Sequence, residues 1–169
     1  MPHHLEFEHW APFPLPRVFA FFSNPENLPR IMPAASATRI LQLNRMPPPS
    51  PPAHTAAERA AGVATIIVTS FRIFPFLPLR AHWIARITEF EWNHHFADVQ
   101  DKGPFKTWHH RHEFKTETRA GVEGTRLRDI IDYEVGFGFA GRIANRFLIR
   151  PQMHRTFAER QKVLPALLS

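Results

Sequence analysis

A turn and the strand after it are encoded at residues 103–114, which read GPFKTWHHRHEF. Glycine and proline at the start favour a turn, and the residues from Trp108 onward alternate in character as in a half-buried strand. One face carries Trp108, His110, His112 and Phe114, and the other carries His109, Arg111, Glu113 and Lys115. Because the second set is more charged, we expect the first set to face the interior.

Two further strands flank this one, at residues 94–100 and 124–135. The connections are short, with Gly103-Pro104 in one and Gly121 and Gly124 in the other, which favours antiparallel hairpins. In the later strand the expected inward set is Thr125, Leu127, Asp129, Ile131, Tyr133 and Val135. In the earlier strand the pattern leaves the inward face undecided.

These hairpins would bring carboxylates beside imidazoles, because cross-strand neighbours lie about 5 Å apart at Cβ. The first hairpin can place Asp98 beside His110 and Phe96 beside His112. The second can place Asp129 beside His112 or diagonal to it, depending on register. We therefore expect two carboxylates and two imidazoles to converge on the concave face, near Trp108 and Tyr133.

The rest of the chain supplies more strands and three helices. Strand patterns cover residues 4–10, 38–43, 63–74 and 79–91. Pro16 opens a short apolar helix, and Asn24 with Pro25 forms the start signal of a second. The order is a strand, two short helices, about six strands and a long helix. This predicts an α+β fold in which a curved antiparallel sheet of six to seven strands grips the last helix.

The last helix is expected at about residues 140–168, with a kink at Pro151. At about 100° per residue, its apolar side carries Ile143, Phe147, Phe157, Leu164 and Leu168, with Arg150, His154 and Gln161 among them. Arg150 and His154 could turn their polar tips toward a ligand or extend them to the rim.

Composition limits the class of protein. With 169 residues, 44% hydrophobic and 21% charged, the chain fits a single folded domain. It has no cysteine, which excludes disulfides and thiol chemistry and fits a cytoplasmic location. It has no apolar run long enough for a membrane span, and its start lacks a secretory signal. The net charge of +6 is scattered, so we expect no specific nucleic-acid binding.

A proline-rich stretch, MPPPSPP at residues 46–52, predicts an exposed, extended loop. We interpret residues 44–61 as a loop insertion within the single domain 1–169. An alternative is that the loop is a docking motif for a partner protein.

Several stretches resemble the START/SRPBCC superfamily of helix-grip proteins, especially its bacterial polyketide cyclase/dehydrase-like members. The matching parts are residues 18–28, 96–100 and 103–114, Gly124-Thr125, Asp129, Tyr133, Phe157 and Arg160. The proline-rich loop departs from the family pattern. The resemblance implies a deep cavity between the sheet and the long helix that holds an apolar or aromatic small molecule, and it implies no single reaction.

The Asp–His cluster has three interpretations. It could be a satisfied polar network that ties strands together, a set of hydrogen-bonding groups for a ligand, or a catalytic group. In the last case the enzyme would be a cyclase, dehydratase or hydrolase in which Asp98 or Asp129 orients His110 or His112 as general base.

A metal site is a rival, since His110 and His112 project to one side and Asp98 or Asp129 could add a third ligand. Both aspartates are expected to pair with histidines instead, so we predict no metal and no cofactor. We expect His94 and His95 to point to opposite faces of a strand and therefore not to share a site.

We predict that the protein binds a hydrophobic small molecule, and the sequence leaves its oligomeric state open. The expected ligand-binding residues are Phe96, Asp98, Phe105, Trp108, His110, His112, Asp129, Tyr133, Phe147, Arg150 and His154.

Overall fold

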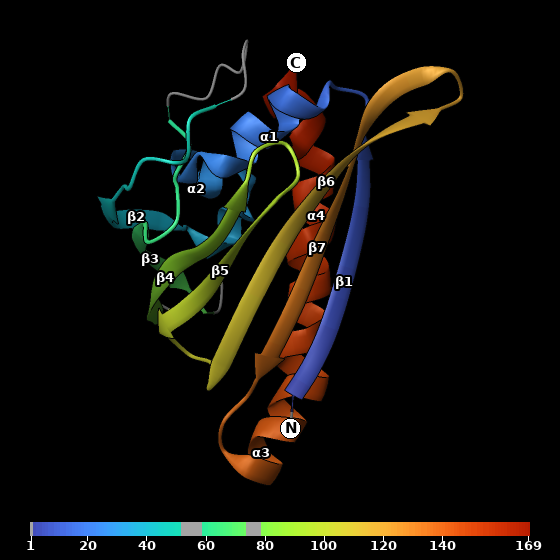
Figure 1. Ribbon diagram of the computed structural model, residues 1–169. Helices are drawn as coiled ribbons and strands as arrows, with labels where there is room; N and C mark the ends of the chain where they lie inside the picture. The colour runs from blue at the N-terminus through green and yellow to red at the C-terminus, as the bar shows by residue number, and fades with distance from the viewer. Residues whose placement is uncertain (1, 52–58, 74–78) are drawn as a thin grey trace.

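Seven antiparallel strands form one sheet in the computed structural model, which describes residues 2–51, 59–73 and 79–169 (Figure 1). The strands are β1 (Pro2–Ala11), β2 (Arg39–Asn44), β3 (Ile66–Arg72), β4 (Arg80–Glu91), β5 (His95–Lys102), β6 (Thr107–Arg119) and β7 (Val122–Glu134). Their order across the sheet is β1-β7-β6-β5-β4-β3-β2. Strands β2 to β7 thus follow one another as hairpin neighbours, and the predicted α+β helix-grip fold is confirmed.

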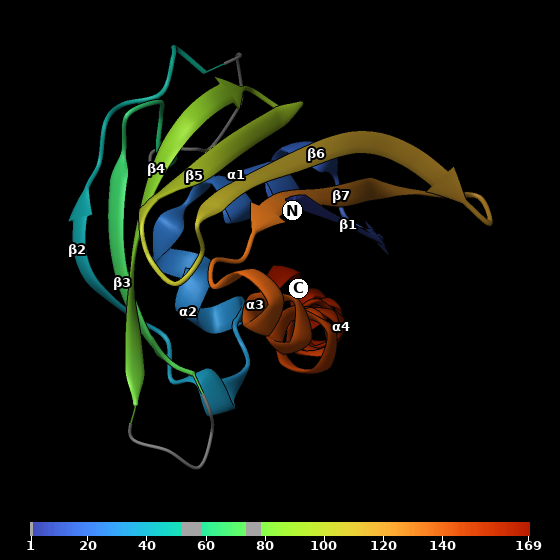
Figure 2. The ribbon, with the colours of Figure 1, turned by 90° about the horizontal axis from the view of Figure 1, so that it is seen from below.

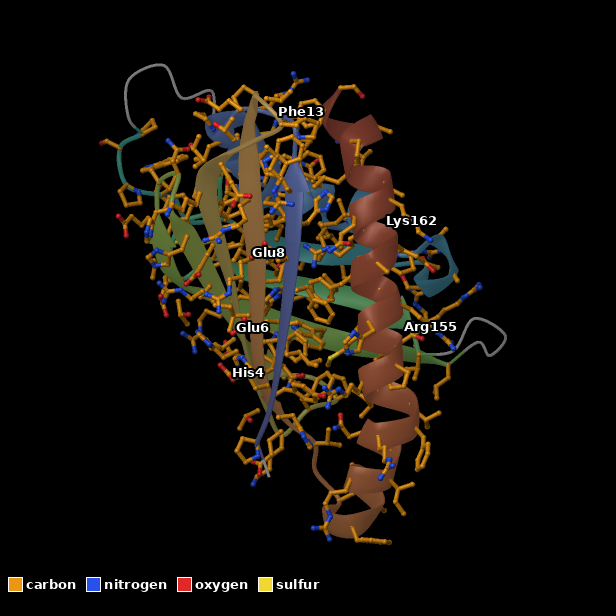
Figure 3. All side chains as sticks on the ribbon, turned by 90° about the vertical axis from the view of Figure 1, so that its right-hand side faces the viewer. His4, Glu6, Glu8, Phe13, Arg155 and Lys162 are labelled. Carbon is orange, nitrogen blue, oxygen red and sulfur yellow. The ribbon has the colours of Figure 1, made fainter. Side chains whose placement is uncertain are left out.

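The sheet curves around the C-terminal helix, which Figure 2 shows almost end-on. The helical elements are α1 (Leu15–Ser23), η1 (Pro25–Asn27), α2 (Leu28–Ile31), η2 (Ala34–Ser36), α3 (Gly138–Ala144), η3 (Asn145–Ile149) and α4 (Arg150–Leu168). Figure 3 shows exposed charged residues on β1, such as Glu6 and Glu8, and on the solvent side of α4, where Arg155 and Lys162 lie. No helix in the described ranges is long and apolar enough to cross a membrane.

The two predicted short helices form as the start signals suggest. Proline occupies the first turn of α1, and the Asn24 side chain accepts a hydrogen bond from the Glu26 amide at the start of η1. Phe19 of α1 is fully buried and packs within about 6 Å of four aromatic rings, three on the strands of the sheet and one, Trp92, in the turn between β4 and β5. This contact fixes the two short helices over one end of the concave face.

The second half of the C-terminal helix presents its predicted apolar side to the sheet, with Phe157, Leu164 and Leu168 buried, whereas the first half does not. The buried side chains of α4 are Met153, Phe157, Arg160, Leu164 and Leu168. Ile143 and Phe147, expected on the inward side, are exposed. The reason is η3, a π-helical turn with more residues per turn than an α-helix, which rotates the residues before it relative to those after it. The irregularity expected at Pro151 therefore takes the form of a π-turn that ends just before this proline.

The described part of the proline-rich loop runs along neighbouring segments. The Trp92 indole donates to the Pro49 carbonyl (2.7 Å), and the Gly62 amide donates to the Met46 carbonyl (2.9 Å). Pro52 and the rest of the loop to residue 58, together with residues 74–78, lie outside the described residues.

Candidate functional site

Strand register brings the predicted polar residues together on the concave face. Asp98 lies opposite His110, Phe96 opposite His112, and His112 opposite Asp129. The predicted hairpin pairings are therefore confirmed, and the second hairpin adopts the direct rather than the diagonal pairing. The register also decides the inward face of β5, because Phe96 and Asp98 lie beside the inward-facing histidines.

Asp129 is the centre of a buried ionic group. Its Oδ1 accepts a hydrogen bond from His110 Nε2 at 2.9 Å, lies 2.7 Å from His112 Nδ1, and is 3.9 Å from Arg160 Nη2. All four residues are buried. Arg160 comes from α4, and the planar guanidinium also lies over the Phe157 ring, 4.6 Å from its centroid. The sheet and the helix are thus joined by a charge pair.

The charge state of this group follows from its surroundings. Burial acts to raise the pKa of Asp129, but Arg160 and the two histidines outweigh it and hold this pKa well below the usual range. Burial lowers the pKa of His110 and of His112. At neutral pH the group is therefore an ionised Asp129–Arg160 pair with two neutral imidazoles.

This arrangement leaves one nitrogen of His110 available. Because Nε2 donates its proton to Asp129, the neutral ring carries a lone pair on Nδ1. That nitrogen lies 4.0 Å from Asp98 Oδ2, which is too long for a hydrogen bond. The Asp98 carboxyl group makes no hydrogen bond within the described part of the chain, and burial raises its pKa. A hydrogen-bond acceptor and a carboxyl group thus face each other without a partner between them.

His112 is held differently. Although its Nδ1 is close to Asp129, the angle does not make a hydrogen bond, and this buried nitrogen has no hydrogen-bond partner among the described residues. The ring stacks on Phe96, with centroids 4.4 Å apart. His112 therefore packs as an aromatic side chain that also carries a polar edge.

Beside the polar group lies a set of aromatic rings, which we call the aromatic wall: Phe71, Trp83, Phe105, Trp108 and Tyr133. Trp108 contacts Trp83 edge-to-face (centroids 4.9 Å apart) and Phe105 (5.0 Å), and Phe105 contacts Tyr133 (5.5 Å). Tyr133 is buried, and its hydroxyl donates to Asn145 Oδ1 at 2.7 Å. The other four rings are only half-buried, so the wall keeps accessible apolar surface.

Three residues of this site are not among the ligand-binding residues predicted from the sequence, namely Phe71, Trp83 and Arg160. Arg160 lies three residues after Phe157 on the same side of the last helix, and a charged residue on an apolar stripe is the signal that marks it. Trp83 comes from β4, and only the curvature of the sheet brings it against Trp108.

Three predicted ligand-binding residues lie elsewhere. Phe147, Arg150 and His154 are exposed, because the π-turn and the rotation of α4 direct them away from the concave face. His154 contacts the Phe7 ring at the edge of the sheet (centroids 5.1 Å apart). The prediction that Phe147 faces the interior is wrong, and the exposure of Arg150 and His154 agrees with the alternative that they extend to the rim.

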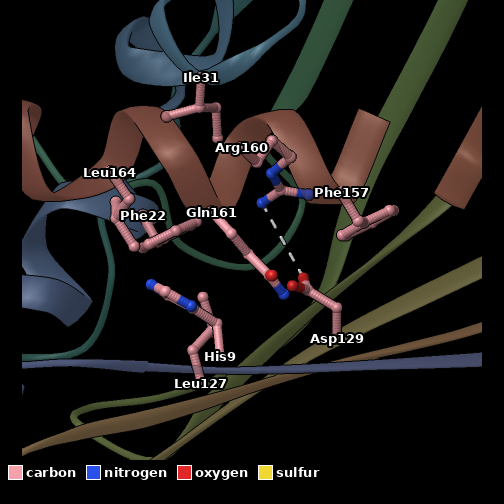
Figure 4. A pocket seen from close by; sticks show the side chains of 9 residues that line it. All are labelled: His9, Phe22, Ile31, Leu127, Asp129, Phe157, Arg160, Gln161 and Leu164. Carbon is pink, nitrogen blue, oxygen red and sulfur yellow. Dashed lines mark ion pairs between the residues drawn. The ribbon is translucent and has the colours of Figure 1, made fainter. Parts of the chain in front are cut away.

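Two hollows adjoin the site. One lies between Asp129 and α4 and is lined by residues including His9, Phe22, Asp129 and Arg160 (Figure 4). With a volume of about 10 Å³, it has room for no more than one water molecule. A larger, open pocket of about 520 Å³ lies where β7 meets α3 and includes His3, Lys106, Phe137 and Arg142.

A metal ion could also use part of this group. Asp98, His110 and His112 each offer one ligand atom, and these atoms lie within 4.8 Å of one another. Asp129 accepts a hydrogen bond from His110 Nε2, so at His110 an ion would need the remaining nitrogen, Nδ1, together with the Asp98 carboxylate.

Comparisons with known proteins agree with this architecture. The START superfamily protein from Mycobacterium smegmatis shares 12% identity over 99% of each chain, with a TM-score of 0.62. The protein TTHA0849 from Thermus thermophilus shares 16% identity over 98% of this chain and 97% of its own, with a TM-score of 0.66. A norcoclaurine synthase from Thalictrum shares 12% identity over 100% and 98% of the two chains (TM-score 0.62). These likenesses show the fold.

No curated protein sequence matches the chain. The sequence profile described as polyketide cyclase / dehydrase and lipid transport, however, matches residues 11–156, which include most of the sheet and the buried Asp129. The chain therefore belongs to the polyketide cyclase / dehydrase and lipid transport family, within the START/SRPBCC superfamily.

Proposed function

We propose that this protein binds an apolar cyclic or aromatic small molecule against the aromatic wall, with Asp98 and His110 as its polar anchor. The observation that carries this proposal is the unpartnered pair of Asp98 Oδ2 and His110 Nδ1, 4.0 Å apart, next to half-buried aromatic rings. A single hydroxyl group of a ligand could lie within hydrogen-bond distance of both atoms and donate its proton to the lone pair on His110 Nδ1.

The chemistry of this surface favours a ring over an alkyl chain. Flat aromatic ligands gain edge-to-face and stacked contacts with indole and phenyl rings in addition to burial of apolar area. A few oriented polar groups in a mostly apolar site are typical of small-molecule pockets. The norcoclaurine synthase structure, described as a complex with a transition state analogue, supports the idea that this fold can hold an organic ligand.

Two measurements test the proposal. Native mass spectrometry of the purified protein shows whether an organic molecule co-purifies with the chain. In parallel, titration with the uncharged aromatic probe N-phenyl-1-naphthylamine should give saturable binding. We expect Trp83→Ala to weaken binding of the probe at least tenfold, because it removes part of the aromatic wall. The control Phe147→Ala, which changes an exposed ring outside the site, should leave binding unchanged. Equal affinities for Trp83→Ala and the unaltered chain would overturn the proposal.

A second candidate is an enzyme of the cyclase, dehydratase or hydrolase type that uses the same site. The observation in its favour is the orientation of His110 by ionised Asp129, which leaves Nδ1 as a proton acceptor on the side of Asp98. If mass spectrometry identifies a ligand, the test is its conversion by the unaltered protein. His110→Phe should then bind the ligand more weakly and release no product even at saturating ligand, whereas undiminished turnover would exclude this mechanism.

A further inference from the structure

Two adjacent histidines meet at the turn between β4 and β5. The strand alternation predicted from sequence is wrong here, because His94 lies in the turn and only His95 begins β5. Asn93 adopts a positive φ of 57°, which reverses the chain. As a result, the Nδ1 atoms of His94 and His95 lie 2.9 Å apart, and Glu91 Oε2 lies 3.4 Å from each of them.

These three atoms have the spacing of ligands around one ion. Donor atoms on a tetrahedral zinc, with bonds of about 2.0–2.1 Å, lie roughly 3.3 Å from one another. We propose that Glu91, His94 and His95 bind a divalent transition metal such as zinc, with a water molecule in the fourth position. Two imidazoles and one carboxylate form a donor set suited to such ions.

The surroundings support this site. The other ring nitrogen of His95, Nε2, lies 3.3 Å from Glu89 Oε2, and Arg111 donates to that same carboxylate at 2.7 Å. A carboxylate behind a metal-ligating histidine orients the ring and strengthens its basicity. The His95 side chain is 13% exposed, whereas those of His94 and Glu91 are 62% and 63% exposed. One ligand is thus held in place, and the two others are open to an ion from solvent.

Zinc titration of chelator-treated protein by calorimetry tests the proposal. We expect one equivalent to bind, His94→Ala to weaken binding at least tenfold, and Glu89→Gln to weaken it about tenfold. The control is His4→Ala, since His4 also lies between two carboxylates on the surface, and it should bind as the unaltered chain does. Absence of zinc binding, equal affinity in His94→Ala, or loss of binding in His110→Phe instead would overturn the proposal.

A separate observation concerns the surface around α3 and η3, which we call the end patch. It carries large apolar side chains with exposures from 47% to 88%, namely Phe137, Phe139, Ile143, Phe147 and Leu148. Arginines alternate with them, and two lie over exposed rings: Arg142 over Phe139 at 5.5 Å and Arg146 over Phe147 at 5.6 Å. The sequence has no acidic residue from 135 to 158.

The side chains of the end patch indicate the kind of surface that it would bind. Exposed aromatic and aliphatic side chains interleaved with arginines are typical of helices that lie in the interface of an anionic bilayer. A second copy of the chain would place the same arginines against one another, which disfavours a dimer through this face. We infer that the end patch docks on the surface of an anionic membrane.

The position of the patch suits this role. In Figure 1, α3 projects beyond the end of the sheet, near the N-terminus. Phe137, Phe139 and Arg142 also line the open pocket of about 520 Å³. A docked membrane would face that pocket. An apolar ligand could then pass between the membrane and the pocket without crossing water. This last step depends on the proposed function, whereas docking itself does not.

Flotation with vesicles of phosphatidylcholine and phosphatidylglycerol tests the docking. We expect binding to mixed vesicles that weakens with salt, and little binding to phosphatidylcholine alone. Phe139→Ser with Phe147→Ser should abolish flotation, and Arg146→Gln should weaken binding about fivefold. The control Leu41→Ser, which alters an exposed apolar residue on β2, should float normally. No flotation, or equal flotation of the double variant, would overturn the inference. So would concentration-dependent dimerisation that the double variant abolishes.

Discussion

Asp129 illustrates how a single buried charge is made tolerable. An isolated carboxylate in the interior would be strongly destabilising, but two imidazoles from β6 and a guanidinium from α4 lie against it, and His110 donates a hydrogen bond to it. Both imidazoles are neutral, so Arg160 supplies the only positive charge among these three contacts. The Asp129–Arg160 ion pair is therefore what allows a charged carboxylate to lie buried beside the histidines. A buried ion pair is nevertheless weak evidence that the fold gains net stability from it.

Replacing Arg160 by methionine should expose this dependence. The substitution keeps much of the apolar stem but leaves the Asp129 carboxylate buried without its counter-ion, so we expect a loss of about 3–5 kcal/mol in the free energy of unfolding. Urea denaturation at pH 7 measures it. Arg155→Met, on the solvent side of α4, is the matched control and should change stability by less than about 0.5 kcal/mol. Similar losses in the two variants would contradict this account.

Among the elements, η3 decides which side of the C-terminal helix meets the sheet. Asn145 begins this π-turn, is buried, and accepts the hydrogen bond of the Tyr133 hydroxyl. The bond connects the end of β7 to the turn in the helix. It thereby holds α3 near the end of the sheet, where the end patch and the open pocket lie.

Tyr133→Phe tests this role of the hydrogen bond. The ring can keep its packing, but the Asn145 side chain loses its partner, which costs about 1–3 kcal/mol for a buried polar group. We expect amide hydrogen exchange to become faster at residues 138–149, while β4 and β5 keep their protection. Unchanged exchange across 138–149 would show that the hydrogen bond does not hold the helix start.

For the whole molecule, the buried histidines make stability depend on pH. The pKa values of His110 and His112 are lowered in the folded state. Below about pH 6.5, these two histidines therefore bind protons in the unfolded chain but not in the folded chain. Their full contribution to the free energy of unfolding is present above about pH 6.5. It is lost as the pH falls toward the lowered pKa, at up to about 1.4 kcal/mol per pH unit for each histidine. The raised pKa of Asp98 acts in the opposite direction at lower pH.

We therefore expect Tm to fall between pH 7 and pH 5. The His112→Phe variant removes one of the titrating groups and retains a ring against Phe96, so its Tm should fall less steeply. Thermal unfolding of both chains in buffers of equal ionic strength makes the comparison. A steeper fall in the variant would mean that His112 is not the buried neutral group described above.

Much of the fold and the centre of the site could be predicted from the sequence. The side chains of a strand alternate with period two, so the residues around Trp108 and Asp129 had only two possible orientations, and charge decided between them. Short glycine-containing connections then limited the partners of each strand. This is why local pattern was enough to place Asp98 beside His110 and to place Asp129 either beside His112 or diagonal to it, whereas the register in the structure decided for the direct pairing.

Other features depended on tertiary structure. An amphipathic helix with polar residues in its stripe allows several rotations, and only packing through a π-turn directed Arg160 inward and Phe147 outward. Likewise, the reversal at Asn93 brought His94 and His95 together, and sheet curvature brought Trp83 to Trp108. Local periodicity determined which side chains of β6 and β7 face the interior, whereas the inward face of β5 was decided by its register with β6. Which distant side chains meet there was decided by how the elements pack, because contacts across the fold depend on rotations and curvature that no local pattern specifies.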